Sequence, residues 1–225
     1  MEKYGNFWVP KMDTFGRKNR QKMLNLFGHK DGTIDPLKHA FEYLFNESPH
    51  LYSKEKIAID AGANVGSYTR VLLQYFNNVI AFEPVRETFL CLERNMHEAQ
   101  QFHRVELYNS AVSDRWEYVK IKKGWARLSM TASVAPGGDI SAIPIDELQL
   151  KNVGFLKLDV EGYELKALAG AHNTIIESKP IIFMEVKPEE EENLSNPYEA
   201  HNYVLNCGYQ IVQKLGRNWV YYPIQ

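Results

Sequence analysis

The 225-residue sequence contains little cysteine, since Cys91 and Cys207 are its only two and they lie far apart. A disulfide framework and a cysteine-rich metal site are therefore not expected, which fits a reducing compartment. Long hydrophobic runs are also absent. No stretch approaches the roughly 18 apolar residues that cross a membrane, and the first residues lack the apolar core of a signal peptide. We expect a cytoplasmic protein without membrane contact.

A strong net charge is the third absence, because 26 basic residues nearly balance 28 acidic ones. The whole molecule therefore has no field that would favour nucleic acid or membrane as a partner. Within residues 1–50, however, five basic residues form a cluster, with three aromatic residues nearby. The basic residues are Lys11, Arg17, Lys18, Arg20 and Lys22. Such a segment could bind RNA, or it could be a solvated helical extension that packs on the main domain. Asp35 and Pro36 are typical of a helix start.

The most informative stretch is residues 57–69, where a short apolar run leads through Asp60 into a turn with Gly62 and Gly66. The run predicts a buried strand of a parallel sheet. Because glycine has no Cβ, the turn can approach a ligand closely, and the N–H groups of the following helix point out of it. Glu83 ends a second apolar run 23 residues after Asp60. Its carboxylate could accept hydrogen bonds from both hydroxyls of a ribose.

The glycine spacing discriminates between nucleotide cofactors. It is G-x-x-x-G, whereas dinucleotide sites carry G-x-G-x-x-G. No Lys or Arg lies within residues 57–69 to hold a phosphate. S-adenosylmethionine has no phosphate, and its sulfonium and ammonium groups are cationic, so a turn that carries Asp60 suits it better than NAD. A dehydrogenase is thereby disfavoured.

Strands and helices alternate through most of the remaining sequence. We predict helices at 65–76, 86–100, 165–170 and 198–206, further strands at 105–108, 155–159 and 180–186, and a terminal hairpin of 209–215 with 219–222. The pattern predicts an α/β fold with an open, mostly parallel sheet, helices on both faces and an antiparallel end. Residues 116–145 interrupt the alternation. They are either an insertion that covers the pocket or an irregular surface hairpin.

Two motifs carry a family resemblance. Residues 59–66 (I-D-A-G-A-N-V-G) and 157–162 (K-L-D-V-E-G) together resemble the FkbM family of S-adenosylmethionine-dependent methyltransferases, and residues 143–148 look like the usual lead-in to the second motif. The resemblance spans residues 58–186. It implies a class I methyltransferase domain over 51–225, with a Rossmann-like seven-stranded sheet whose last strand is reversed. It also implies O-methylation of sugars, polyketides or other hydroxylated compounds. If residues 116–145 are an insertion over the pocket, they lie on the substrate side.

The resemblance also implies positions for the site residues. Those expected around the methionine part of the cofactor are Asp60, Gly62, Ala63, Asn64 and Gly66. Glu83 would hold the ribose, while Ser110 and Ala111 would border the adenine. Methyl transfer needs an aligned acceptor and, for an alcohol, a base, and Asp159 or Glu161 is expected in that role. Lys157 could lower the pKa of the acceptor or of Asp159, or it could form a buried ion pair that supports the sheet.

Three further alternatives stay open from the sequence. Asp159, Glu161 and Glu185 could together hold Mg²⁺, because divalent magnesium prefers oxygen ligands. The acceptor could be RNA, methylated at the ribose 2′-oxygen and bound through Arg17, Lys18, Arg20 and Lys22. The chain could also be a non-catalytic binding module with the same fold.

Overall fold

Seven strands form the central sheet of the computed structural model, in the order β12-β13-β11-β10-β3-β4-β5. The structure describes residues 1–4, 6–10, 41, 52–122, 133–186 and 197–224. The strands are β3 (Ile57–Ala61), β4 (Asn78–Phe82), β5 (Val105–Tyr108), β10 (Val153–Leu158), β11 (Ile181–Glu185), β12 (Tyr209–Leu215) and β13 (Asn218–Pro223). Neighbouring strands from β5 to β11 are parallel, whereas β13 is antiparallel to both β11 and β12. The predicted sheet and its reversed terminal hairpin are confirmed.

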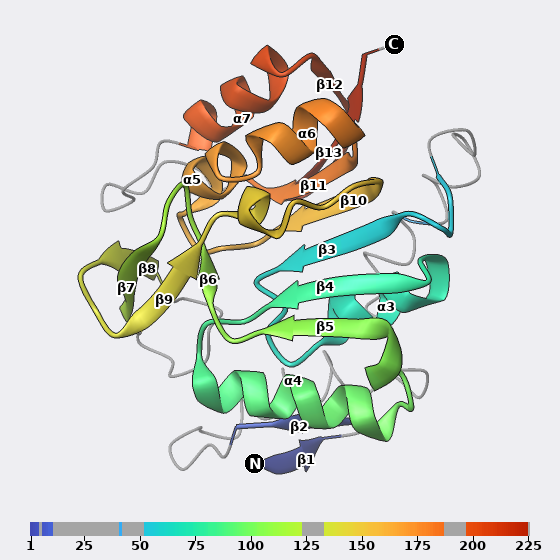
Figure 1. Cartoon of the computed structure of the whole chain (residues 1–225), viewed down its shortest axis with the longest axis vertical. Coiled ribbons are helices and arrows are strands. Elements are labelled where there is room, and N and C mark those ends of the chain that lie inside the picture. Colours follow the sequence, from blue (N-terminus) through green and yellow to red (C-terminus); the bar gives the residue numbers. More distant parts are fainter. Residues whose placement is uncertain (5, 11–40, 42–51, 123–132, 187–196, 225) are drawn as a thin grey trace.

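Helices cover both faces of this sheet (Figure 1). On one face lie α3 (Ser67–Tyr75) and α4 (Arg86–Glu98), and on the other lie α5 (Glu164–Ala169), α6 (His172–Ser178) and α7 (Pro197–Asn206). Because strand side chains alternate, each strand supplies two apolar cores. In β10, Phe155 joins the core under α3, and Leu156 and Leu158 join the core under α5 to α7.

Helix α6 differs from the prediction, which ended the helical segment at Gly170. A Cβ on Gly170 would lie 1.9 Å from the carbonyl oxygen of Ser113, so this glycine permits a close backbone contact. The chain then continues into α6, whose first turn is fixed by Asp146. Its carboxylate accepts the backbone N–H of Asn173 at 2.8 Å and of Thr174 at 2.9 Å. Asp146 itself belongs to a short 3-10 turn, Ile145–Leu148.

A second sheet of four short strands lies beyond the carboxyl ends of β3, β4 and β5 (Figure 1). Its order is β6-β9-β7-β8, and the strands are β6 (Ala111–Val112), β7 (Glu117–Lys122), β8 (Ser133–Pro136) and β9 (Ile140–Ile143). This sheet contains the described part of the predicted insertion. Val119 and Ala142 are fully buried, so its inner side packs into the core shared with α5 to α7.

The first residues form a hairpin, β1 (Glu2–Tyr4) and β2 (Phe7–Val9), that packs on α4. Asn95 anchors it: the backbone N–H of Trp8 donates to Asn95 Oδ1 at 2.6 Å, and Asn95 Nδ2 donates to the carbonyl of Trp8 at 2.9 Å. The helix predicted from Asp35 and the basic cluster lie outside the described residues, apart from the buried Phe41. None of the described helices is long and apolar enough to span a membrane.

Candidate active site

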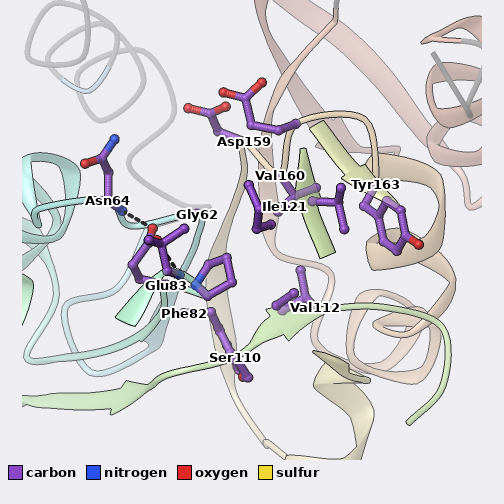
Figure 2. Close-up of a pocket in the computed structure, with 15 residues that line it drawn as sticks. Gly62, Asn64, Phe82, Glu83, Ser110, Val112, Ile121, Asp159, Val160 and Tyr163 are labelled. Carbon is purple, nitrogen blue, oxygen red and sulfur yellow. Dashed lines mark hydrogen bonds between the residues drawn. The ribbon is translucent and has the colours of Figure 1, made fainter. Parts of the chain in front are cut away.

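A pocket opens where β3, β4 and β10 end (Figure 2). Seven predicted residues line it, and they are Gly62, Asn64, Glu83, Ser110, Ala111, Asp159 and Glu161. In Figure 2, Asp159 lies at one end of the pocket and Ser110 at the other, with Gly62 and Glu83 between them.

Gly62 is required by the geometry of the turn. Its φ is +81°, and a Cβ would lie 1.9 Å from the carbonyl oxygen of Asp159. The N–H groups of Gly62 and Ala63 donate to the carbonyl of Phe82 at 3.0 and 2.9 Å, which fixes the turn against β4. Ala63 itself is buried in the core under α3, so its side chain does not face the pocket.

Gly66 serves packing between the two helices. Its φ is +90°, and a Cβ there would lie 2.6 Å from Leu92 Cδ1 and 2.8 Å from Met96 Cε, both on α4. Gly66 is not among the residues that line the pocket. Its small size therefore lets α3 begin close to α4.

Glu83 is buried at the pocket wall, with 3% of its surface exposed. Its Oε2 accepts the backbone N–H of Asn64 at 3.0 Å, and its Oε1 accepts that of Val85 at 2.9 Å (Figure 2). Burial raises the pKa of Glu83 to about 7, while these two N–H groups act in the opposite direction. Each carboxylate oxygen can accept more than one hydrogen bond, so the side chain can also receive ribose hydroxyls.

Asp60 and Lys157 form a buried ion pair behind the turn. Lys157 Nζ lies 2.9 Å from Asp60 Oδ1 and also donates to the carbonyl of Gly62 at 3.1 Å. Asp60 Oδ2 accepts the hydroxyl of Thr69 at 2.7 Å. Burial alone lowers the pKa of Lys157, but Asp60 and then Asp159 outweigh it and raise the pKa above its ordinary value. Neither member of the pair lines the pocket, so both hold the turn from behind.

The three acidic residues predicted to hold Mg²⁺, Asp159, Glu161 and Glu185, do not all line the pocket. Asp159 and Glu161 line the pocket, whereas Glu185, at the end of β11, does not. Glu161 has a left-handed φ of 54°, which places it in a tight turn past the strand end. Among the described residues, no three His, Cys, Asp or Glu side chains come together in a way that could hold a metal ion.

Sequence reasoning missed the apolar wall of the pocket. Its residues come from β6, β7, β8 and the turn after β10, and they are Val112, Ile121, Val134, Val160 and Tyr163. Figure 2 shows Val112, Ile121, Val160 and Tyr163 on one side of the pocket. Ile121 and Val134 are directly opposite each other in the second sheet and belong to the predicted insertion. The alternation of residues 117–121 was the available signal, but it did not say which face would meet the pocket.

The residues present fit S-adenosylmethionine. Gly62 lines the pocket without a side chain, and the Glu83 carboxylate lies in the pocket wall, where ribose hydroxyls can donate to it. Ser110 Oγ is buried at the end of the pocket opposite Asp159, and no group in the described part of the chain bonds to it. Lys and Arg do not occur among the residues that line the pocket, so its lining offers no cationic side chain to a pyrophosphate.

Comparison with solved structures identifies the fold as that of class I S-adenosylmethionine-dependent methyltransferases. FkbM methyltransferase from Methylobacillus flagellatus KT gives a TM-score of 0.53 at 22% identity, over 76% of this chain and 44% of that one. Magnesium protoporphyrin IX methyltransferase from Synechocystis PCC 6803 was solved with bound S-adenosylmethionine. It gives a TM-score of 0.51 at 10% identity, over 93% of this chain and 85% of that one. Precorrin 8w decarboxylase from Methanobacterium thermoautotrophicum gives 0.51 at 13% identity, over 100% of both chains.

The sequence itself shows which family the chain belongs to. The model described as the methyltransferase FkbM domain matches residues 60–211, well over half of the chain. The chain therefore belongs to the FkbM methyltransferase family, as its two motifs predicted. It spans less than half the length of the Methylobacillus relative. A search of curated protein sequences found no match.

Proposed function

We propose that this protein transfers the methyl group of S-adenosylmethionine to a hydroxyl oxygen of a sugar, a glycan or a small hydroxylated metabolite. The observation that carries the proposal is the place of Asp159, which lines the pocket beside the glycine turn. An alcohol must lose its proton as its oxygen attacks, so a carboxylate at this end of the pocket has a direct role.

Gly62 and Asn64 border the methionine part of the cofactor, Glu83 accepts the ribose hydroxyls, and Ser110 with Ala111 borders the adenine. The remaining members of the predicted set support the turn without facing the pocket, and they are Asp60, Ala63 and Gly66. The pocket lining supports this assignment because its polar groups follow the same order as the parts of the cofactor.

The chemistry of the site rests on alignment and proton removal. S-adenosylmethionine, when bound, supplies an electrophilic methyl group, so the protein needs no nucleophile of its own. Asp159, or Glu161 two residues on, takes the hydroxyl proton of the acceptor. Lys157 is a positioning residue, because its ammonium group holds the carbonyl of Gly62 and lies outside the pocket lining.

The experiment is transfer of a tritiated methyl group from S-adenosylmethionine to neutral glycosides, small polyols and RNA oligonucleotides. We expect label in a glycoside or polyol. We also expect Asp159→Asn to lose at least 100-fold in rate, the usual scale of a general base, while it keeps its affinity for S-adenosylhomocysteine. Label in RNA that disappears when Arg17, Lys18 and Arg20 are neutralised would instead establish the RNA alternative. Cofactor binding without transfer to any acceptor would indicate a non-catalytic module.

A further inference from the structure

Asn95 is a buried amide on the face of α4 that meets the glycine turn. Only 1% of its surface is exposed. Leu92 and Met96 lie on the same face of the helix, and they are the two side chains that a Cβ on Gly66 would strike. Asn95 Nδ2 donates to the backbone carbonyl of Val65, the residue before Gly66, at 2.8 Å. Helix α4 therefore bonds to the glycine turn through this amide as well as packing on it.

The same amide holds the amino-terminal hairpin. Its Oδ1 accepts the backbone N–H of Trp8 at 2.6 Å, and its Nδ2 donates to the carbonyl of Trp8 at 2.9 Å in addition to that of Val65. A side-chain amide has two N–H donors and one acceptor oxygen, so a single orientation of Asn95 satisfies all three backbone groups. Aspartate would lack both donors, and leucine, which has a similar shape, would lack all three bonds. The hairpin and the glycine turn thus depend on one side chain.

Residues 64 and 65 of the turn are held at both ends. The backbone N–H of Asn64 donates to Glu83 Oε2 at 3.0 Å, and the carbonyl of Val65 accepts the bond from Asn95. Asn64 lines the pocket, and its φ of 53° lies in the left-handed region that residues other than glycine seldom adopt. Such a conformation persists where the surrounding structure fixes it. Loss of the bond from Asn95 would release one end of this segment at the pocket.

We infer that Asn95 is a positioning residue that couples the hairpin β1–β2 to the cofactor site, an inference that rests on the proposed function because it takes the pocket to bind S-adenosylmethionine. The docked hairpin fixes the orientation of the Asn95 amide. That amide fixes the carbonyl of Val65, and with it the position of Asn64 at the pocket. Coupling between two sites is reciprocal, so a bound cofactor stabilises the docked hairpin by the same factor by which the hairpin strengthens cofactor binding.

The test combines calorimetric titration with S-adenosylhomocysteine and hydrogen–deuterium exchange of the intact chain. Asn95→Leu removes the three hydrogen bonds, whereas the control Thr174→Val removes a buried bond to Asp146 on the other side of the sheet. We expect Asn95→Leu to weaken binding about tenfold, as for one lost hydrogen bond, and Thr174→Val to bind as the wild type does. In the wild type, saturating ligand should slow exchange of the Trp8 backbone N–H by about the same factor, and in Asn95→Leu it should have no such effect.

Exchange in the wild type requires no variant, so it decides the matter even where Asn95→Leu fails to fold. Exchange of the Trp8 N–H that ligand binding leaves unchanged would overturn the coupling. An Asn95→Leu protein that binds S-adenosylhomocysteine as tightly as Thr174→Val would also overturn it. In both cases the ligand still binds, so the proposed function stands. Failure of the wild type to bind S-adenosylhomocysteine would instead contradict the proposed function and the coupling together.

Discussion

At the scale of single residues, Glu83 holds a carboxylate inside the pocket wall, with one backbone N–H bonded to each oxygen. Burial raises its pKa to about 7 from an ordinary value of 4.5. Between these two pH values the folded state binds a proton that the unfolded state has released. The free energy of unfolding therefore falls as the pH rises through this window, and it is unaffected below it, where both states are protonated.

This predicts a pH dependence that Glu83→Gln should remove. Relative to the variant, the wild type should lose about 3 kcal/mol of stability between pH 4.5 and pH 8, the free energy that corresponds to the raised pKa. Urea unfolding of both proteins across this range gives the difference directly. Parallel stability curves for the two proteins would show that the buried carboxylate keeps its ordinary pKa.

Lys157 and Asp60 give a second prediction at this scale. Lys157→Met leaves the Asp60 carboxylate fully buried without its cation, which should destabilise the protein by about 3–5 kcal/mol. The matched control is Lys151→Met, which breaks an exposed ion pair of 2.7 Å with Glu177 and should cost about 0–1 kcal/mol. Denaturant unfolding at neutral pH measures both. Equal costs for the two variants would mean that the buried pair does not hold the turn.

At the scale of elements, the turn between β3 and α3 depends on a contact with the end of β10. Gly62→Ala would place a Cβ against the backbone carbonyl of Asp159, which cannot move without β10. We expect the variant to lose at least tenfold in affinity for S-adenosylhomocysteine. Gly137→Ala is the control, since Gly137 also has a positive φ, +76°, but no atom lies within 4 Å of its added Cβ.

Gly137→Ala should therefore show only the strain of a left-handed residue, about 1–2 kcal/mol in stability, and bind the ligand as the wild type does. Calorimetric titration and thermal unfolding of both variants separate the two effects. If Gly62→Ala keeps full affinity, the close approach between the turn and β10 does not shape the ligand site.

At the scale of the whole molecule, the features that local sequence encodes were predictable. The alternation of apolar runs with helical segments predicted the strands of the central sheet and most of the helices. The glycine turn together with Glu83 predicted one side of the pocket. The second sheet was not predictable, because β6 is two residues long and pairs with β9 about 30 residues later. Its contribution to the pocket, through Ile121 and Val134, depends on that pairing and leaves no local pattern.

The burial of Lys157 distinguishes between the two roles that the sequence allowed for it. Lys157 belongs to a motif beside Asp159, and sequence alone allowed it either to act on the acceptor or to form a buried pair. The structure leaves 1% of its surface exposed, with its ammonium group against Asp60 and the carbonyl of Gly62. Which face of a strand meets the ligand depends on the helices packed against it, and residue spacing within one strand does not contain that information.

The central claim is that the pocket between the glycine turn and the second sheet binds S-adenosylmethionine. Calorimetric titration of the purified protein with S-adenosylmethionine, S-adenosylhomocysteine and NAD⁺ tests it most directly. We predict dissociation constants on the order of micromolar for the first two ligands, a typical affinity for a small-molecule site, and no binding of NAD⁺. Absence of binding by the first two ligands, or binding of NAD⁺ instead, would contradict the account.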